Sequence, residues 1–391
     1  MTDEREKTAQ PEAVSFTPPL RMHHLSGGVG FLLGQNKLGW IAAPGINPLR
    51  PVTLRDLNAV PKLFAPYKKI RVLGRTVYQH ADELHDPITD HFVLSATTSE
   101  HRCLASNQEH HWSGVSTALH VQERGNEGVL ASRVASQIHI CTRKLEQLSK
   151  AYRTVLSIVG APTQPDQHKI TNDKYAQHIG TEFRSLLNEL YGLRDAVNGA
   201  VYRLNYGREE GFRTDRFRRA VEDDKSALAK LISQSMFDGD GDKLIERMSL
   251  YRSVALHCLG KNNPIFGDGY QQLIASGPLG DIPYLVWPLY DDIERMREIQ
   301  RGSSRGILGA FSREEAERFL KKEDHLDALE FCFDCFVRLL RIAELLSSDT
   351  ALPSRPMIIT DDDIIEATFT NEDGNVIRVA RDATTGKLVE V

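Results

Sequence analysis

Two long stretches with three- and four-residue apolar spacing constrain this chain most. The first covers residues 127–160 and ends where a Gly-Ala-Pro-Thr-Gln-Pro segment begins at Gly160. The second covers 172–206, and its apolar stripe runs from Phe183 to Val201. This period is that of an amphipathic α-helix, whose apolar stripe must be buried against other elements. The pattern predicts two long helices in a helical core, the second of them capped by Thr171 or Asn172.

Further helical patterns follow at 212–236, from Asp242 to about 257–260, and at 312–348. A stretch at 260–281 that is rich in Gly, Asn and Pro predicts a loop between the last two. The fold class is therefore mainly α, with a helical bundle at 116–350.

The two ends of the chain have a different character. Residues 1–20 lack periodicity and predict a disordered tail. Residues 21–115 contain short apolar or alternating runs among prolines and glycines, which predicts a small β-containing, α/β accessory domain. Residues 351–391 alternate in period two around Gly-containing turns, so a three-stranded β-meander is expected there.

Composition limits the class of protein. Hydrophobic residues make up 41% and charged residues 26%, which is globular composition. The net charge of −5 argues against a protein that coats nucleic acid, although a local basic patch remains compatible with it. Five scattered cysteines, no apolar run of membrane-spanning length and no apolar segment near the N-terminus predict a soluble, cytoplasmic protein.

Three short motifs have structural explanations. Residues 238–242, Asp-Gly-Asp-Gly-Asp, lack the Gly and Glu of a calcium loop and favour a helix cap at Asp240 or Asp242. Cys332 and Cys335 have metal-ligand spacing but lie among phenylalanines in a helical run, which favours core positions. The Gly27-Gly-Val-Gly30 segment lacks the remainder of a phosphate-binding loop.

Residues 50–75 contain seven basic side chains against one acidic one, interleaved with aromatic residues. Positive charge beside aromatic surfaces suits single-stranded nucleic acid, although most charge runs are simply solvated faces. The candidate RNA-binding residues are Lys62, Lys68, Lys69 and Arg71, together with Lys261 and Asn262 after the helix that ends near residue 257.

Arg252 and His257 form the most informative pair. Arginine is always charged and its planar fork matches two phosphate oxygens. Histidine can accept or donate a proton near neutral pH. On an unbroken helix the two side chains would lie about 140° apart, but Gly260 and Pro264 predict that the helix stops just past His257.

This Arg-x4-His pattern in a helical bundle resembles the HEPN superfamily over about 170–300. The segment at 182–204 is similar to the long first helix of such bundles, and Ser253 stands where the family more often has Asn, Asp or His. The resemblance implies a metal-independent endoribonuclease with no cofactor. It implies Arg252, Ser253 and His257 as site residues, with Arg252 holding the scissile phosphate and His257 as general acid and base.

The resemblance also implies a homodimer whose copies converge on a shared cleft. Many such proteins belong to toxin or antiviral defence systems, so an antitoxin or regulatory protein is a conceivable partner besides RNA. Two alternatives stay open. One is a non-catalytic helical scaffold that binds a nucleotide, RNA or protein, and the other is an N-terminal enzyme that uses a metal bound by Glu109 with the neighbouring histidines His101, His110, His111 and His120.

Overall fold

A computed structural model describes the N-terminal sheet, most of the helical region and three C-terminal strands. The residues described are 19–45, 51–56, 59–78, 91–99, 102–162, 169–206, 214–234, 243–257, 269–304, 314, 318–319, 325–349, 366–370, 376–381 and 388–390. Within these ranges, no helix combines the length and the apolar character needed to cross a membrane.

The N-terminal region forms a six-stranded antiparallel sheet in the order β4-β3-β2-β1-β5-β6. Its strands are β1 (Leu20–Leu25), β2 (Gly30–Leu33), β3 (Leu38–Ala42), β4 (Val52–Thr53), β5 (Val72–Tyr78) and β6 (His91–Leu94). A short helix, α1 (Val60–Phe64), precedes β5. Alternate residues such as Leu25, Phe31 and Leu33 are fully buried, so one face of the sheet packs against the helices.

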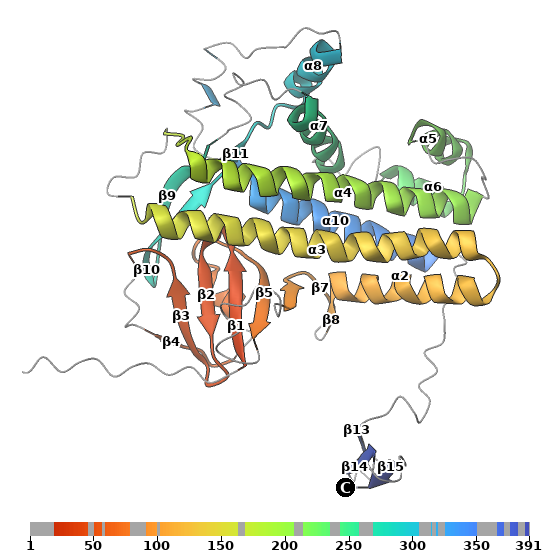
Figure 1. Cartoon of the computed structure of the whole chain (residues 1–391), viewed down its shortest axis with the longest axis horizontal. Helices are drawn as coiled ribbons and strands as arrows, with labels where there is room; N and C mark the ends of the chain where they lie inside the picture. The colour runs from red at the N-terminus through yellow and green to blue at the C-terminus, as the bar shows by residue number, and fades with distance from the viewer. Residues whose placement is uncertain are drawn as a thin grey trace, which may run out of the picture.

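Four long helices form the body of the protein. They are α2 (Leu104–Val121), α3 (Gly125–Val159), α4 (Lys174–Tyr206) and α10 (Ala328–Asp349). Figure 1 shows α2, α3 and α4 side by side, with α10 behind them and the sheet against α3. The mainly helical fold class with an N-terminal sheet is therefore confirmed.

The two longest helices match the sequence prediction closely, but their caps differ. Asp173 caps α4, because its Oδ1 accepts hydrogen bonds from the backbone N–H groups of Tyr175 and Ala176, both at 2.8 Å. The prediction of Thr171 or Asn172 as cap was wrong. Aspartate accepts such bonds as well as asparagine does, so the choice depended on the entry path of the chain.

The helix expected at 312–348 is interrupted: residues 314, 318 and 319 are helical, but a strand at Leu326–Asp327 precedes the long helix α10, which begins at Ala328. Asp327 caps the N-terminus of α10, because its Oδ2 accepts from the N–H groups of Leu329 and Glu330 at 3.0 and 3.2 Å. Residues Leu326–Asp327 form a short strand, β12, that pairs with β11 (Pro288–Leu289). The apolar period continued across this boundary in the sequence, so it did not mark the start.

The helix expected at 212–236 is two helices, α5 (Thr214–Asp223) and α6 (Ala227–Ile232). Ser226 divides them, because its hydroxyl accepts a hydrogen bond from the N–H of Ala229 at 3.0 Å and its own N–H donates to Asp224. Asp and Ser side chains compete with helical backbone bonds in this way.

The loop expected at 260–281 is partly a β-hairpin. Strands β9 (Gln271–Gly277) and β10 (Gly280–Val286) pair antiparallel around the Pro278-Leu279 turn, and Gly280 has a φ of 100°. The Gly-rich composition reflects the turn, and neither strand alternates apolar with polar residues, so the sequence pattern did not indicate them. Helix α8 (Ile293–Ser304) follows.

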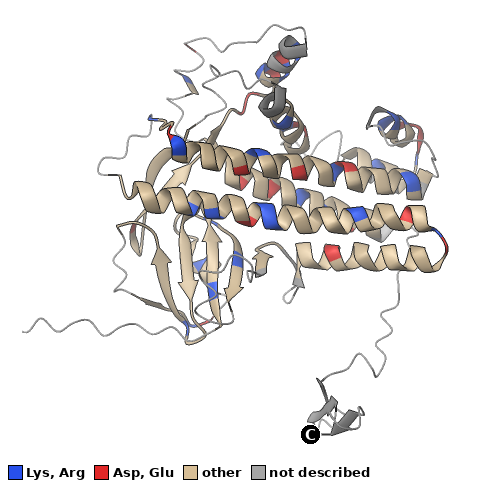
Figure 2. Ribbon diagram, in the orientation of Figure 1, with Lys and Arg blue, Asp and Glu red and all other residues tan. Residues whose placement is uncertain are grey.

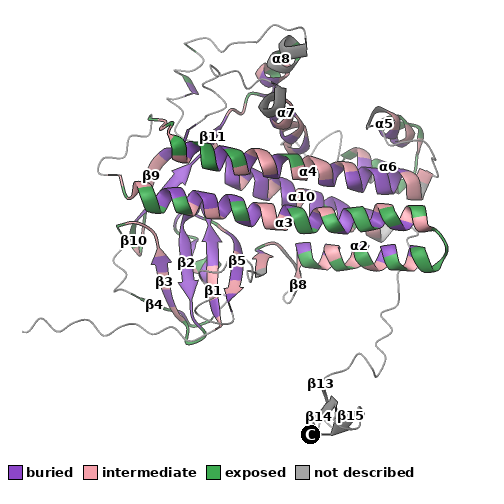
Figure 3. Ribbon diagram, in the orientation of Figure 1, coloured by how far each residue is buried: buried purple, intermediate pink, exposed green. Residues whose placement is uncertain are grey.

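One continuous core joins the sheet to the helices. Its buried residues extend from Leu25 of β1 to Leu346 of α10, and Figure 3 shows the buried positions on the facing sides of the elements. Helix α2 starts at Leu104 and so crosses the boundary expected at residue 115. The sheet is a layer on the helical body rather than a separately packed unit.

Two glycines allow the turn after β1 to approach helix α3 and the β9–β10 hairpin. Gly27 and Gly28 lie in the 3₁₀ turn η1 (Ser26–Gly28) with φ of 66° and 82°. A Cβ on Gly28 would lie 2.6 Å from the carbonyl carbon of Tyr152 in α3, and one on Gly27 would lie 2.7 Å from the carbonyl oxygen of Leu285. Close backbone packing therefore explains the Gly-rich segment.

Other predictions have mixed outcomes. Cys332 and Cys335 are fully buried in α10, so their assignment to the core is confirmed. The 238–242 segment lies outside the described residues, as do residues 1–18. Near the C-terminus, β13 (Glu366–Thr370), β14 (Val376–Arg381) and β15 (Leu388–Glu390) pair in that order, while the turns expected between them lie outside the described residues.

Candidate functional site

Helix α7 (Leu244–His257) carries the candidate catalytic motif. Ile245, Met248 and Tyr251 recur every three residues and are buried. The Tyr251 ring meets the edge of Phe331 in α10 at 5.0 Å, and its hydroxyl donates to the carbonyl of Tyr290. Burial raises the pKa of Tyr251, so this hydroxyl stays a donor. These contacts set the rotation of α7 and direct Arg252 toward α4.

Arg252 is held by two residues of α4. Its Nε donates to Asn188 Oδ1 at 3.3 Å, and its guanidinium carbon lies 4.1 Å from the centroid of the Tyr191 ring. No polar partner for its two terminal nitrogens exists among the described residues. One edge of a positioned guanidinium is therefore available to a pair of anionic oxygens.

A second arginine contacts the same ring. The guanidinium carbon of Arg194 lies 3.8 Å from the Tyr191 centroid. Its Nη1 donates to Ser249 of α7 at 2.7 Å, and its Nε and Nη2 donate to Asp195. Arg194 is nearly buried and its charge is balanced by Asp195, so it positions Tyr191 and α7 rather than offering a free cation.

The motif alone did not reveal the α4 side of this site. Asn188, Tyr191 and Arg194 are spaced three residues apart, which places them on one face of a helix. That spacing is visible in the sequence at 182–204. Nothing in the sequence indicates, however, that this face meets α7.

The structure describes only part of the predicted catalytic set. Ser253 is half-buried on α7 beside Arg252 and takes part in another interaction. Helix α7 continues without a break to His257, so five residue steps leave the Arg252 and His257 positions about 140° apart. The side chain of His257 lies outside the described residues, as do Lys261 and Asn262.

The basic residues of 50–75 lie elsewhere. Lys62 on α1 and Lys68 and Lys69 in the following turn are exposed. Arg71 already forms a two-bonded ion pair with Asp334 of α10, at 2.7 and 3.2 Å, and its guanidinium carbon lies 4.7 Å from the Phe333 centroid.

Arg71 and Tyr251 contact α10 one turn apart: Asp334 pairs with Arg71, and Phe331 meets the Tyr251 ring. On the helices drawn in Figure 2, Lys and Arg alternate with Asp and Glu. Among the described residues, no contact links Lys62, Lys68 or Lys69 with Arg252.

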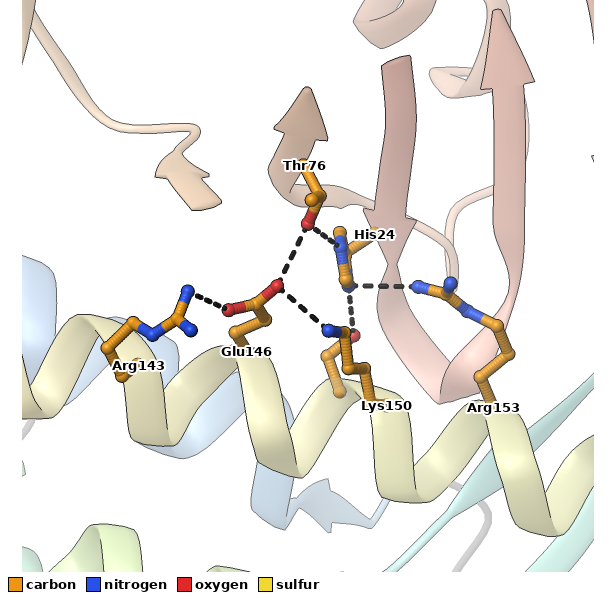
Figure 4. A network of polar contacts seen from close by, with 7 residues as sticks. His24, Thr76, Arg143, Glu146, Lys150 and Arg153 are labelled. Carbon is orange, nitrogen blue, oxygen red and sulfur yellow. Dashed lines mark hydrogen bonds and ion pairs between the residues drawn. The ribbon is translucent and has the colours of Figure 1, made fainter. Parts of the chain in front are cut away.

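A polar network between the sheet and α3 also has residue types common in catalysis (Figure 4). Within it, His24 of β1 contacts Ser149 Oγ through Nδ1 at 3.0 Å and Thr76 Oγ1 through Nε2 at 2.8 Å. Thr76 donates to Glu146 at 3.1 Å, and Arg153 contacts His24 Nδ1 at 2.9 Å.

Burial, with Arg153 nearby, lowers the pKa of His24 well below its usual value, so the ring is neutral. Because Arg153 is only a donor, Nδ1 accepts and Nε2–H donates to Thr76. The hydrogen bonds thus run in one direction from Arg153 to Glu146. His24, Thr76 and Ser149 have almost no exposed surface. The network fixes the sheet on α3 and is not open to a substrate.

The histidines considered as metal ligands are dispersed along α2. His110 Nδ1 bonds to the Ser106 carbonyl at 2.7 Å and His120 Nδ1 to the Ser116 carbonyl at 2.8 Å, while Glu109 meets His139 of α3 at 3.3 Å. Among the described residues, no group of three or more suitable side chains could hold a metal ion. His101 lies outside them.

Comparison with known proteins adds no assignment: no family model, curated protein or solved structure matches the chain. Arg252 and its surroundings are therefore the features of this chain that point to a function.

Proposed function

We propose that this protein is a metal-independent endoribonuclease of HEPN type, and that Arg252 binds the scissile phosphate. The observation that carries the proposal is the guanidinium of Arg252, which Asn188 and Tyr191 hold and whose terminal nitrogens have no polar partner among the described residues. A positioned arginine that need not rearrange can stabilise the charge that grows on a phosphate in the transition state.

His257 supplies proton transfer in this proposal. The 2′-hydroxyl of the RNA attacks the phosphorus while His257 accepts its proton, and the bond from phosphorus to the 5′-oxygen breaks. The departing oxygen takes up a proton, and the products are a 2′,3′-cyclic phosphate and a 5′-hydroxyl. Arg252 neutralises the phosphoryl oxygens throughout, so no metal is required.

Arg252 and His257 are about 140° apart around the axis of α7, so they do not face one site within a single chain. The proposal therefore includes a second copy of the chain. In a symmetric dimer, Arg252 of one copy can meet His257 of the other. A test follows directly. Mixing the Arg252→Ala and His257→Ala proteins restores cleavage if the two residues come from different copies, because one site of each mixed dimer is intact.

A second candidate function is anion binding without catalysis. The same separation favours it, because the described part of a single chain then offers a fixed arginine without a base beside it. In this case Arg252 anchors a phosphate of RNA or of a nucleotide, and His257 has no chemical role.

The deciding experiment is cleavage of a mixed RNA pool in EDTA by the wild type and by the Arg252→Ala and His257→Ala variants. Arg218→Ala is the matched control, because Arg218 is an exposed arginine of α5 paired with Glu222. We expect cyclic-phosphate products from the wild type and the control only. Cleavage that survives His257→Ala contradicts a nuclease that uses His257 for proton transfer. RNA binding that depends on Arg252, without any cleavage, supports the second candidate function.

A further inference from the structure

A cavity of about 210 Å³ lies at the start of α10. Its described walls come from η1, the turn that contains Lys68, the β9–β10 hairpin and the start of α10. Four segments that are distant in sequence therefore enclose it. The volume is below the roughly 300–1,000 Å³ of sites for drug-sized ligands, so the cavity suits a small metabolite.

The walls are held in place without a ligand. The Tyr67 hydroxyl donates to the carbonyl of Gly280 at 3.1 Å and accepts from the N–H of Leu279 at 2.7 Å, which fastens the hairpin to the turn. The left-handed Gly27 allows η1 to touch β10. A cavity with fixed walls loses little conformational entropy when it binds a ligand.

Two opposite charges line this cavity without meeting each other. Neither the Lys68 ammonium nor the Glu330 carboxylate has an ion pair or hydrogen bond with any described side chain. Lys69 takes part in another interaction, and the His325 ring is tilted against Phe319 with centroids 4.6 Å apart.

The second carboxylate of the cavity, Asp327, has no capacity left for a ligand. Its Oδ1 accepts from the Tyr152 hydroxyl and the Trp287 N–H, both at 2.8 Å, and its Oδ2 accepts the two N–H groups at the start of α10. Among the lining residues that the structure describes, Lys68 and Glu330 are thus the charges left for a ligand. The lining also includes the side chains of Leu273, Tyr284 and Val286, which offer apolar surface beside the polar Ser26 and Gln271.

We propose that this cavity binds a free α-amino acid with an apolar side chain. Lys68 holds its carboxylate, Glu330 holds its ammonium, and the side chain lies against Leu273, Tyr284 and Val286. An anion such as phosphate would be repelled by Glu330, and a simple amine by Lys68, so the paired charges select a zwitterion. This site is independent of the proposed nuclease.

Titration calorimetry with L-leucine and L-phenylalanine tests the proposal on the full chain. N-acetyl-leucine lacks the ammonium, leucine amide lacks the carboxylate, and inorganic phosphate probes plain anion binding. We expect binding of the free amino acids and none of the three analogues. Binding of N-acetyl-leucine or phosphate with equal affinity, or no binding of either amino acid, overturns the proposal.

Two variants assign the contacts. Lys68→Met keeps the aliphatic stem and removes the charge, and Glu330→Gln keeps the shape. Each should weaken amino-acid binding by at least about tenfold, the usual effect of removing one partner of a close charge pair. The matched control is Lys62→Met, an exposed lysine on α1 that does not line the cavity. Equal weakening by the control, or none by the two variants in a folded protein, contradicts the assignment.

Discussion

The guanidinium of Arg252 lies 4.1 Å from the centroid of the Tyr191 ring, across the contact between α7 and α4. A cation on an aromatic face is attracted by the electrons of the ring and loses rotational freedom. The arginine is therefore already ordered before any phosphate arrives.

The first prediction concerns this ring. Tyr191→Leu should lower the affinity for single-stranded RNA about two- to fivefold, because an exposed cation–π contact contributes about 0.5–1 kcal/mol. Fluorescence anisotropy with a labelled oligonucleotide measures the effect. Tyr175→Leu is the control, since Tyr175 has a similar contact with Lys174 at the start of α4. An equal loss in the control would argue against a role for Tyr191 in positioning Arg252.

The second prediction concerns Glu146, the buried acceptor of the network between sheet and α3. Glu146→Ala removes the partner of Arg143, Lys150 and the Thr76 hydroxyl together. Breaking a buried charged network from one side costs about 3–5 kcal/mol.

Urea unfolding followed by circular dichroism measures this loss. Glu222→Ala is the comparison, because Glu222 forms an exposed helical pair with Arg218 and such pairs contribute about 0.3–0.5 kcal/mol. Similar free energies of unfolding for the two variants would mean that the network does not hold the sheet on α3.

The third prediction is a pH dependence. Burial, followed by Arg75 and Arg21, lowers the pKa of His23 to about 3. The unfolded chain binds a proton at His23 below about pH 6.5, while the folded protein does not until about pH 3. Stability should therefore fall as the pH drops between these values, by about 1.4 kcal/mol per unit for His23 alone.

Replacing His23 with leucine removes this proton uptake. We expect a shallower loss of stability between pH 6 and pH 4 than in the wild type, measured as the free energy of unfolding at each pH. The pKa of His24 is lowered as well, so the free energy of unfolding of the variant still depends on pH, but less steeply. Asp327 contributes in the opposite direction in both proteins, because burial raises its pKa to about 7. Parallel curves for the two proteins would contradict a neutral His23.

The fourth prediction compares two glycines. Gly28→Ala places a Cβ 2.6 Å from the backbone of α3 at a φ of 82°. The sheet must then move away from the helix, and we expect a loss above about 2 kcal/mol. Gly114→Ala on α2 meets no atom within 4 Å and should raise stability by about 0.5–1 kcal/mol. Thermal unfolding of both variants tests whether the first lowers and the second raises stability relative to the wild type.

Helix periodicity was reliable where the pattern was long. The predictions for 127–160 and 172–206 end within two residues of α3 and α4. It failed where a single polar side chain interrupts the backbone, as Ser226 does between α5 and α6 and Asp327 does before α10. Several Ser and Asp residues near a helix start can act as its cap, and the direction from which the chain enters the helix determines which of them does.

The candidate site, too, could be predicted only in part from the sequence. The sequence identifies Arg252 and His257 as residue types suited to phosphate chemistry, and it predicts the helix that carries them. It could not indicate that Asn188 and Tyr191 hold Arg252, that Asp334 neutralises Arg71, or that Lys68 shares a cavity with Glu330, since these pairs are far apart along the chain.

By itself, the sequence determined the helical body, the buried stripes of α3 and α4 and the core positions of Cys332 and Cys335, because local period and composition encode them. Only the tertiary structure decided which charges are paired and which are left for a ligand. The reason is physical: the charge of a side chain is local, whereas its partner and its exposure depend on which distant segment packs against it.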